Sequence, residues 1–155
     1  MSESRQTAGV VLYRRTERGV EVLLARPGDP FRPAQEEGAW TIPKGPPGAE
    51  EDLLAAAKRH FKEITGMVPG AAFFPLAAAR TGNGTVVYAW AVEGDWDPRL
   101  LKSGTFEAYW PPGSPIKQKF PELDRAEWFT VAEARRWISV GQAPLIEELR
   151  TVTGA

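Results

Sequence analysis

Residues 38–67, GAWTIPKGPPGAEEDLLAAAKRHFKEITGM, contain the residue types from which a protein can build a site for a cation and a phosphate. Gly45 allows a tight turn, acidic residues cluster before a segment with helical spacing, and Gly66 is a natural helix stop. A loop that leads into a helix in this way can present backbone groups and carboxylates to a charged ligand. The helix also carries a histidine, a lysine and an isoleucine, so its chemistry depends on which side chains share a face.

His60, Glu63 and Ile64 lie three and four positions apart, which places them on one face of a helix within a single turn. Three carboxylates there would form a compact oxygen cluster for Mg²⁺, which requires oxygen ligands in near-octahedral geometry. Of the three residues, Glu63 alone is a carboxylate. His60 allows three interpretations: a surface or partly buried helix histidine, a general base, or an imidazole that binds Mn²⁺ or Zn²⁺ together with Glu63.

The spacing of five residues in this stretch resembles a known motif, the Nudix box, G-x5-E-x7-R-E-U-x-E-E-x-G-U, in which U is a bulky apolar residue. The five residues are Gly45, Glu51, Arg59, Glu63 and Gly66. The segments AGVVLYRR, GAWTIPKG, FEAYWPP and FPELDRAEWFTVAEAR are similar, in the same order, to a bacterial subfamily of small predicted nucleotide pyrophosphohydrolases. The resemblance covers residues 7 to about 150.

The resemblance implies a single Nudix domain over residues 1–155 and the α/β fold of that family, a Nudix-type α/β/α sandwich with a mixed sheet. It also implies hydrolysis of a nucleoside diphosphate linked to another group, assisted by Mg²⁺ or Mn²⁺. In the family, box carboxylates and the carbonyl of the box glycine hold the metal. These roles fall here on Gly45, Glu51 and Glu63, while Arg59 matches an arginine that orients a box glutamate.

Two departures from the box change the expected activity. His60 and Ile64 occupy the positions of glutamates that the family uses as metal ligands or as the base. We therefore expect a divergent hydrolase with weak cation binding and weak turnover, in which Glu63, Arg59, and His60 or Glu122 carry the catalysis. The alternative hypothesis is a Nudix-like domain that binds a nucleotide or phosphate, has lost turnover and serves a regulatory role.

Several residues outside the helix are candidates for substrate contacts. Lys44, beside the glycine turn, could contact phosphate as a point charge or be a solvated loop lysine. The segment SPIKQKFPELD contains Lys117, Lys119 and Glu122, which could bind substrate or supply a base, or could form a charged surface loop. Trp110, with its neighbour Tyr109, could stack on a nucleobase, although tryptophans more often pack in cores.

The remaining elements must position these residues, and the apolar pattern predicts a mixed sheet with helices on its faces. We expect strands at 7–15, 20–27, 40–42, 104–110 and 126–129, a hairpin joining 73–81 to 85–94, and helices at 51–65, 130–139 and 143–152. Residues 27–38 and 111–122 are rich in glycine and proline and predict loops. Thr130 and Glu133 have the spacing of a capping box.

The central helix at 51–65 has a clear inner and outer face. The inward-facing residues are expected to be Leu53, Ala57, Phe61 and Ile64, and the outward-facing residues Lys58 and Lys62.

The composition of the 155 residues fits one domain, and the formal net charge of −1 gives no electrostatic reason to expect a nucleic acid or an acidic membrane as partner. The sequence has no cysteine, so it excludes disulfides and thiolate zinc sites. The segment MSESRQTAG lacks the apolar core of a signal peptide, and the longest apolar runs are too short to span a bilayer. We expect a cytoplasmic protein whose partner is a small nucleotide or pyrophosphate compound, and the sequence leaves its oligomeric state open.

Overall fold

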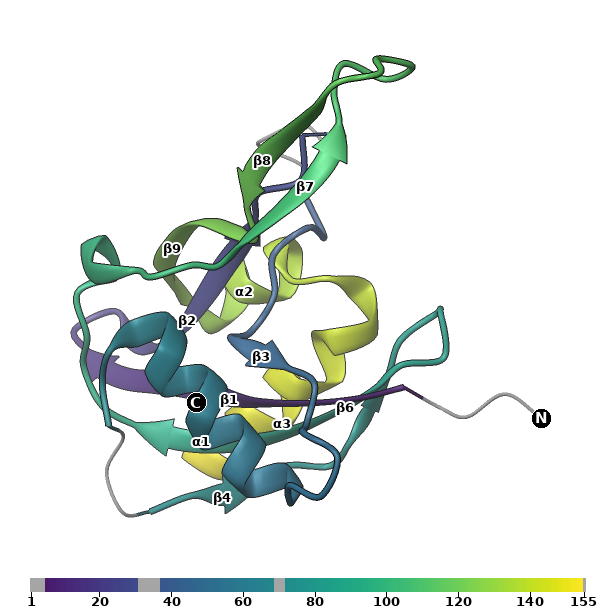
Figure 1. Cartoon of the computed structure of the whole chain (residues 1–155). Coiled ribbons are helices and arrows are strands. Elements are labelled where there is room, and N and C mark those ends of the chain that lie inside the picture. The colour runs from purple at the N-terminus through teal and green to yellow at the C-terminus, as the bar shows by residue number, and fades with distance from the viewer. Residues whose placement is uncertain (1–4, 31–36, 69–71, 155) are drawn as a thin grey trace.

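Figure 1 shows the computed structural model, which describes residues 5–30, 37–68 and 72–154. A mixed sheet has the strand order β4-β6-β1-β2-β9, with β3 added to β1 and β5 to β6. Its strands are β1 (Gln6–Thr16), β2 (Gly19–Pro27), β3 (Lys44–Gly45), β4 (Phe74–Pro75), β5 (Ala79–Arg80), β6 (Val86–Glu93) and β9 (Leu123–Thr130). The helices are α1 (Leu53–Thr65), α2 (Val131–Trp137) and α3 (Ala143–Thr153), with short 3-10 turns η1 (Pro98–Leu100) and η2 (Val140–Gln142).

Strand β1 forms the centre of the sheet. It pairs in parallel with β6, from Gln6 opposite Val86 to Tyr13 opposite Glu93, and antiparallel with β2. Six consecutive residues of β1, 8–13, are buried, which is typical of a strand covered on both faces. The predicted mixed sheet is therefore confirmed.

Helices cover both faces of this sheet (Figure 1). On one face, Ala57 and Phe61 of α1 pack in a core cluster with Val10 and Leu12 of β1. On the other face, the cluster contains the following residues of β1, β2 and α3: Val11, Val22, Leu24, Leu145, Ile146 and Leu149. This arrangement is the predicted α/β/α sandwich.

Helix α1 begins at Leu53 rather than at Glu51, because the side chain of Asp52 caps it by accepting a hydrogen bond from the backbone N–H of Ala55 at 2.9 Å. Gly66 ends the helix in the left-handed conformation, with φ 73°. The predicted faces are confirmed. Ala57 and Phe61 are buried, Leu53 and Ile64 are half-buried, and Lys58 and Lys62 are exposed.

A two-stranded arm projects from the body of the molecule (Figure 1). It consists of β7 (Thr105–Tyr109) and β8 (Lys117–Pro121), paired antiparallel. The prediction of a loop throughout 111–122 was wrong, because Pro111, Pro112 and Pro115 all lie in the connection and leave β8 free to pair. Phe120 stabilises the pairing through ring contacts with Phe106 at 5.8 Å and Trp110 at 6.3 Å.

Other predictions need smaller corrections. Residues 40–42 form only isolated bridges, from Thr41 to Ala25 and from Trp40 to Ile138, because the chain there crosses between β2 and the end of α2. The expected strand at 73–81 is reduced to β4 and β5, and Pro75 lacks the N–H that a ladder needs. The hairpin between β5 and β6 is confirmed.

At the C-terminal side, β9 begins at Leu123, three residues earlier than expected, and the capping box of Thr130 and Glu133 is confirmed. The predicted loop at 27–38 falls partly outside the described residues. In the part of the chain that the structure describes, no helix is both long and apolar enough to cross a bilayer.

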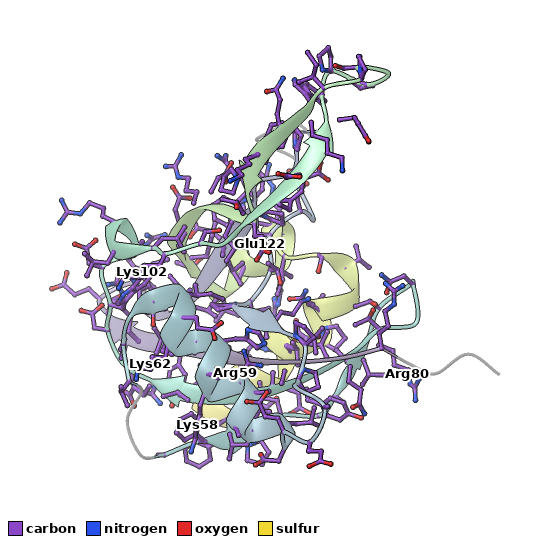
Figure 2. All side chains as sticks on the ribbon, in the orientation of Figure 1. Lys58, Arg59, Lys62, Arg80, Lys102 and Glu122 are labelled. Carbon is purple, nitrogen blue, oxygen red and sulfur yellow. The ribbon has the colours of Figure 1, made fainter. Side chains whose placement is uncertain are left out.

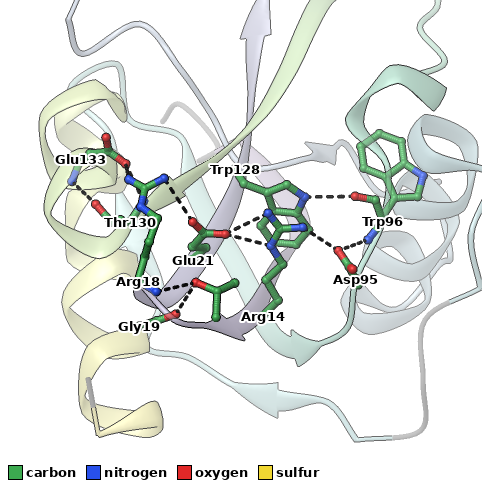
Figure 3. A network of polar contacts seen from close by, with 10 residues as sticks. Arg14, Arg18, Gly19, Glu21, Asp95, Trp96, Trp128, Thr130 and Glu133 are labelled. Atoms are coloured by element: carbon green, nitrogen blue, oxygen red, sulfur yellow. Dashed lines mark hydrogen bonds and ion pairs between the residues drawn. The ribbon is translucent and has the colours of Figure 1, made fainter.

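A polar network lies at the β2–β9 side of the sheet (Figure 3). Glu21 of β2 is 3% exposed and lies 2.9 Å from the guanidinium of Arg14 and 3.4 Å from that of Arg18. Arg14 also pairs with Asp95 at 2.8 Å and stacks over the ring of Trp128, 4.2 Å from its centroid. These contacts join β1 and β2 to β9 and to the loop after β6.

Candidate functional site

A cavity of about 310 Å³ lies between β3, α1 and the segments that flank the base of the arm. It brings together five of the residues predicted to act in the site: Lys44, Gly45, His60, Glu63 and Glu122. The side chain of Ile64 also contributes to its wall. Figure 2 shows Glu122 near the base of the arm and Arg59 on α1, on the two sides of this region.

The His60 ring packs directly against the glycine turn. A Cβ atom at Gly45 would overlap three atoms of the ring, so only glycine leaves room for it. Nε2 of His60 lies 2.7 Å from the Pro46 carbonyl oxygen, which can only accept, so Nε2 donates its hydrogen there. In the neutral imidazole, Nδ1 is then left as an acceptor, 3.5 Å from Oε2 of Glu63.

Arg59 binds both remaining box carboxylates. Its Nε and Nη2 donate to the two oxygens of Glu51 at 2.9 and 2.8 Å, and its Nη1 donates to Oε1 of Glu63 at 3.2 Å. The hydrogen bonds from Arg59, together with one from the Gly48 backbone N–H, lower the pKa of Glu51 to about 2. The same carboxylates raise the pKa of Arg59 above its ordinary value. Arg59 therefore contacts both carboxylates, and the orienting role that the resemblance implies for it stays a prediction.

The donor set does not fit an ordinary Mg²⁺ site. Both oxygens of Glu51 accept hydrogen bonds from Arg59, and one oxygen of Glu63 accepts a hydrogen bond from the same guanidinium. The side chain of Ile64 has no atom that can bind a metal ion. Across residues 5–30, 37–68 and 72–154, no group of three or more His, Cys, Asp or Glu side chains is placed to hold a metal ion. Of the three predicted metal ligands, Gly45 and Glu63 line the cavity, while Glu51 is not one of its lining residues.

Two further predicted residues have distinct environments in the cavity. Lys44 is half-buried on β3, and burial lowers the pKa of its ammonium group. Glu122 is exposed, and its backbone is fixed by hydrogen bonds to Gly104 and Gly28. Glu122 therefore lies at the cavity wall, and its role as a base stays a prediction.

The other candidates lie on the arm, outside the cavity wall. Lys117 and Lys119 are exposed on β8, and the Lys117 ammonium lies over the Tyr109 ring at 5.4 Å. Trp110 packs at the edge of Phe120. Their roles in substrate binding remain predictions, and they require a ligand that extends from the cavity along the arm.

Sequence patterns do not point to two residues of the cavity wall, Lys102 and Ser103. The backbone N–H of Lys102 donates to the Ile64 carbonyl at 2.7 Å, and Oγ of Ser103 accepts from the Leu123 N–H at 2.8 Å. The first contact holds the segment before β7 against the end of α1, and the second holds it against the start of β9. Figure 2 shows Lys102 near the end of α1.

The sequence and the fold both resemble those of known proteins. The sequence matches the family model of the NUDIX domain over residues 3–149, which is nearly the whole chain. The chain belongs to the NUDIX family. A comparison of this NUDIX chain with curated proteins found no match.

Solved structures share the NUDIX fold at low sequence identity. The NUDIX domain of Shewanella oneidensis NrtR, complexed with ADP ribose, is 17% identical, with a TM-score of 0.66 over 98% of this chain and 90% of that one. A C. elegans Ap4A hydrolase in a binary complex is 19% identical, with a TM-score of 0.66 over 96% and 98%. A mutT/nudix family protein from Listeria innocua is 15% identical, with a TM-score of 0.66 over 98% and 95%. At these identities the likeness is one of fold.

Proposed function

We propose that this NUDIX chain binds nucleoside diphosphate-linked compounds in the cavity beside Gly45 and hydrolyses their pyrophosphate bond slowly. The observation that carries the proposal is the set of side chains that α1 has at the positions of the Nudix box. Glu63 lines the cavity and accepts a hydrogen bond from Arg59, whereas His60 and Ile64 stand where the resemblance to the Nudix box expects two glutamates. His60 Nδ1, Glu63 and Glu122 are the groups available to accept a proton from water, and Lys44 is available to contact phosphate.

Cation binding is a separate part of the proposal. NUDIX enzymes generally use divalent cations, and we expect Mg²⁺ or Mn²⁺ to bind the free protein only in the millimolar range or weaker, because affinity for hard cations follows the number of available carboxylates. Isothermal titration calorimetry of the free protein with each cation measures this directly. Tight Mg²⁺ binding would contradict the proposed weakness of the site.

A second candidate function is binding without turnover, in a sensing or regulatory role. Ile64 favours it, because this side chain supplies no oxygen at a wall position where the family has a glutamate. The crystallised NUDIX domain of NrtR with ADP ribose is a structural neighbour that holds such a compound.

A hydrolysis screen separates the two functions. ADP ribose, diadenosine polyphosphates and other nucleoside diphosphate derivatives would be incubated with the protein in Mg²⁺ and Mn²⁺ separately, and binding would be measured in parallel. Slow, enzyme-dependent cleavage supports the hydrolase, and binding without cleavage supports the second function. If none of the compounds is bound or cleaved, both proposals are wrong.

The double substitution His60→Glu with Ile64→Glu tests the role of the replaced residues. It restores three carboxylates beside Gly45, so Mg²⁺ should raise the melting temperature more than in the parent, and cleavage of at least one substrate should rise. Without metal, the variant should lose about 1–3 kcal/mol, because Ile64 is half-buried. Lys58→Glu with Lys62→Glu, which adds two carboxylates on the exposed face of α1, is the matched control. A folded double variant without either gain would mean that the site is not of the NUDIX metal type.

A further inference from the structure

Strand β9 is the last strand at one end of the sheet, next to β2 (Figure 1). In the described part of the chain it pairs with β2 alone, and beyond its first residue, where the Leu123 N–H donates to Oγ of Ser103, no other segment continues the ladder. A trough of about 960 Å³ follows its outer edge and is lined by every residue from 123 to 129. An open edge presents unpaired backbone groups to which another chain can add a strand.

The backbone groups of Ala126, near the middle of β9, point to this open edge. Ala126 lies opposite Ala25 of β2, and the N–H and C=O of Ala25 are both bonded to Thr41, at 2.8 and 2.9 Å. Ala25 and Ala126 therefore exchange no hydrogen bonds with each other. In an antiparallel pair of this kind, both residues direct their N–H and C=O outward, so the donor and the acceptor of Ala126 face away from β2.

The residues on either side of Ala126 have opposite charges. Arg125 and Glu127 share one face of β9, where their side chains are 57% and 37% exposed and form an ion pair at 2.5 Å. If a second β9 strand pairs antiparallel with Ala126 opposite Ala126, each Arg125 lies opposite Glu127 of the other copy. The two nearest registers that keep the backbone donors and acceptors matched place Arg125 opposite Arg125, or Glu127 opposite Glu127. Like charges directly opposite destabilise a ladder, so the charges select a single register.

We infer that β9 binds the β9 strand of a second copy of this chain, antiparallel about a two-fold axis at Ala126. Such an interface is isologous, so each contact occurs twice. The two Ala126 residues exchange two backbone hydrogen bonds. The pairs of Arg125 with Glu127 then occupy the positions without hydrogen bonds on either side, where Cα atoms approach to about 4.5 Å. The sheet of one copy therefore continues into the sheet of the other.

Sedimentation velocity of the whole chain over a range of concentrations measures this association, and the parent should form a reversible dimer. Arg125→Glu and Glu127→Arg each place like charges opposite one another in both pairs, so each should raise the dissociation constant of the dimer about tenfold or more. An equimolar mixture of the two variants should dimerise again, because a mixed dimer restores opposite charges in both pairs. Arg135→Glu, which reverses one charge of the exposed pair with Glu147, is the matched control and should leave the constant within about twofold.

Recovery in the mixture supports pairing between copies, because the ion pair within each variant chain stays broken. A parent that is monomeric at every concentration would overturn the inference, and the edge would then be available to a segment of another protein. A dimer that neither charge reversal weakens would also overturn it, since the interface would lie elsewhere. Weakening by both reversals without recovery in the mixture would overturn it as well, because Arg125 and Glu127 would then not lie opposite each other across the interface.

Discussion

Arg59 couples the two surviving box carboxylates, and its bond with Glu51 should make stability depend on pH. The pKa of Glu51 is lowered from 4.5 to about 2 by hydrogen bonds from Arg59 and Gly48. A carboxylate with a lower pKa in the folded than in the unfolded chain stabilises the fold while it is ionised. This contribution should be complete above about pH 5 and should disappear as the pH falls from about 4.5 to about 2.

The measurement is the difference in free energy of unfolding between the parent and Glu51→Gln across that pH range. The parent should be the more stable protein at neutral pH, and the difference should shrink towards zero in acid. Glu50→Gln, at an exposed neighbouring position, controls for the loss of one charge before α1. A difference that is constant down to about pH 2 would contradict the bond with Arg59 as the cause.

The contact between Gly45 and His60 gives a second prediction at the scale of single residues. Gly45→Ala places a Cβ atom in the space of the His60 ring and should cost about 1–3 kcal/mol. In a His60→Ala background the same change should cost much less, because the ring is gone. Urea denaturation of the parent, both single variants and the double variant measures this coupling. Equal costs of Gly45→Ala in the two backgrounds would mean that the ring does not fill this space.

Much of the candidate site could be predicted from the sequence, because the resemblance to the Nudix box named its residues and helical spacing placed His60, Glu63 and Ile64 on one face. Lys44 and Gly45 lie beside His60 and Glu63 because only residues 46–52 separate β3 from α1. Lys102 could not be predicted, since its position depends on a hydrogen bond to the Ile64 carbonyl that no periodic pattern encodes. Short-range spacing predicts one wall of the cavity, and the opposite wall depends on long-range contacts.

At the scale of elements, the N-terminal cap of α1 fixes where the box helix begins. Asp52→Ala removes the acceptor for the Ala55 N–H and should destabilise the protein by about 1 kcal/mol, as is usual for the loss of a cap. Asp52→Asn keeps an acceptor oxygen and should retain most of the stability. Chemical denaturation of the three proteins gives the comparison. If Asp52→Asn lost as much stability as Asp52→Ala, charge rather than the cap would be responsible.

Elements with a strong apolar pattern could be predicted, and those fixed by pairing could not. The buried runs of β1 and β2 and the two-faced pattern of α1 identified these elements directly. The sequence did not predict strand β8, because KQKFP is mostly polar and follows three prolines. This segment forms a strand through its ladder with β7. Residues 40–42 resemble a strand in composition, yet they meet other strands at single bridges.

At the scale of the whole molecule, the Glu21 network joins distant parts of the chain. Glu21→Gln leaves Arg14 and Arg18 without their buried carboxylate and should cost about 1–3 kcal/mol, since hydrogen bonds to charged groups are lost inside the fold. Glu93→Gln is the control, because its pair with Arg15 at 3.8 Å is about half exposed on both sides and should be worth less than about 1 kcal/mol. Urea denaturation near pH 7 measures both. Similar losses in the two variants would contradict a special role of the buried carboxylate.

The parallel ladder between β1 and β6 has a consequence for the order of events during synthesis. Strand β2 leaves the ribosome directly after β1 and can pair with it at once. Strand β1 can pair with β6, where Gln6 lies opposite Val86, only after β6 has been synthesised. Until then the other edge of the central strand β1 is open, and α1 has been made without a complete sheet to pack on. Unpaired apolar edges invite association with other chains, and pairings between distant segments form slowly. The nascent chain is therefore most vulnerable to aggregation in the interval before β6 emerges.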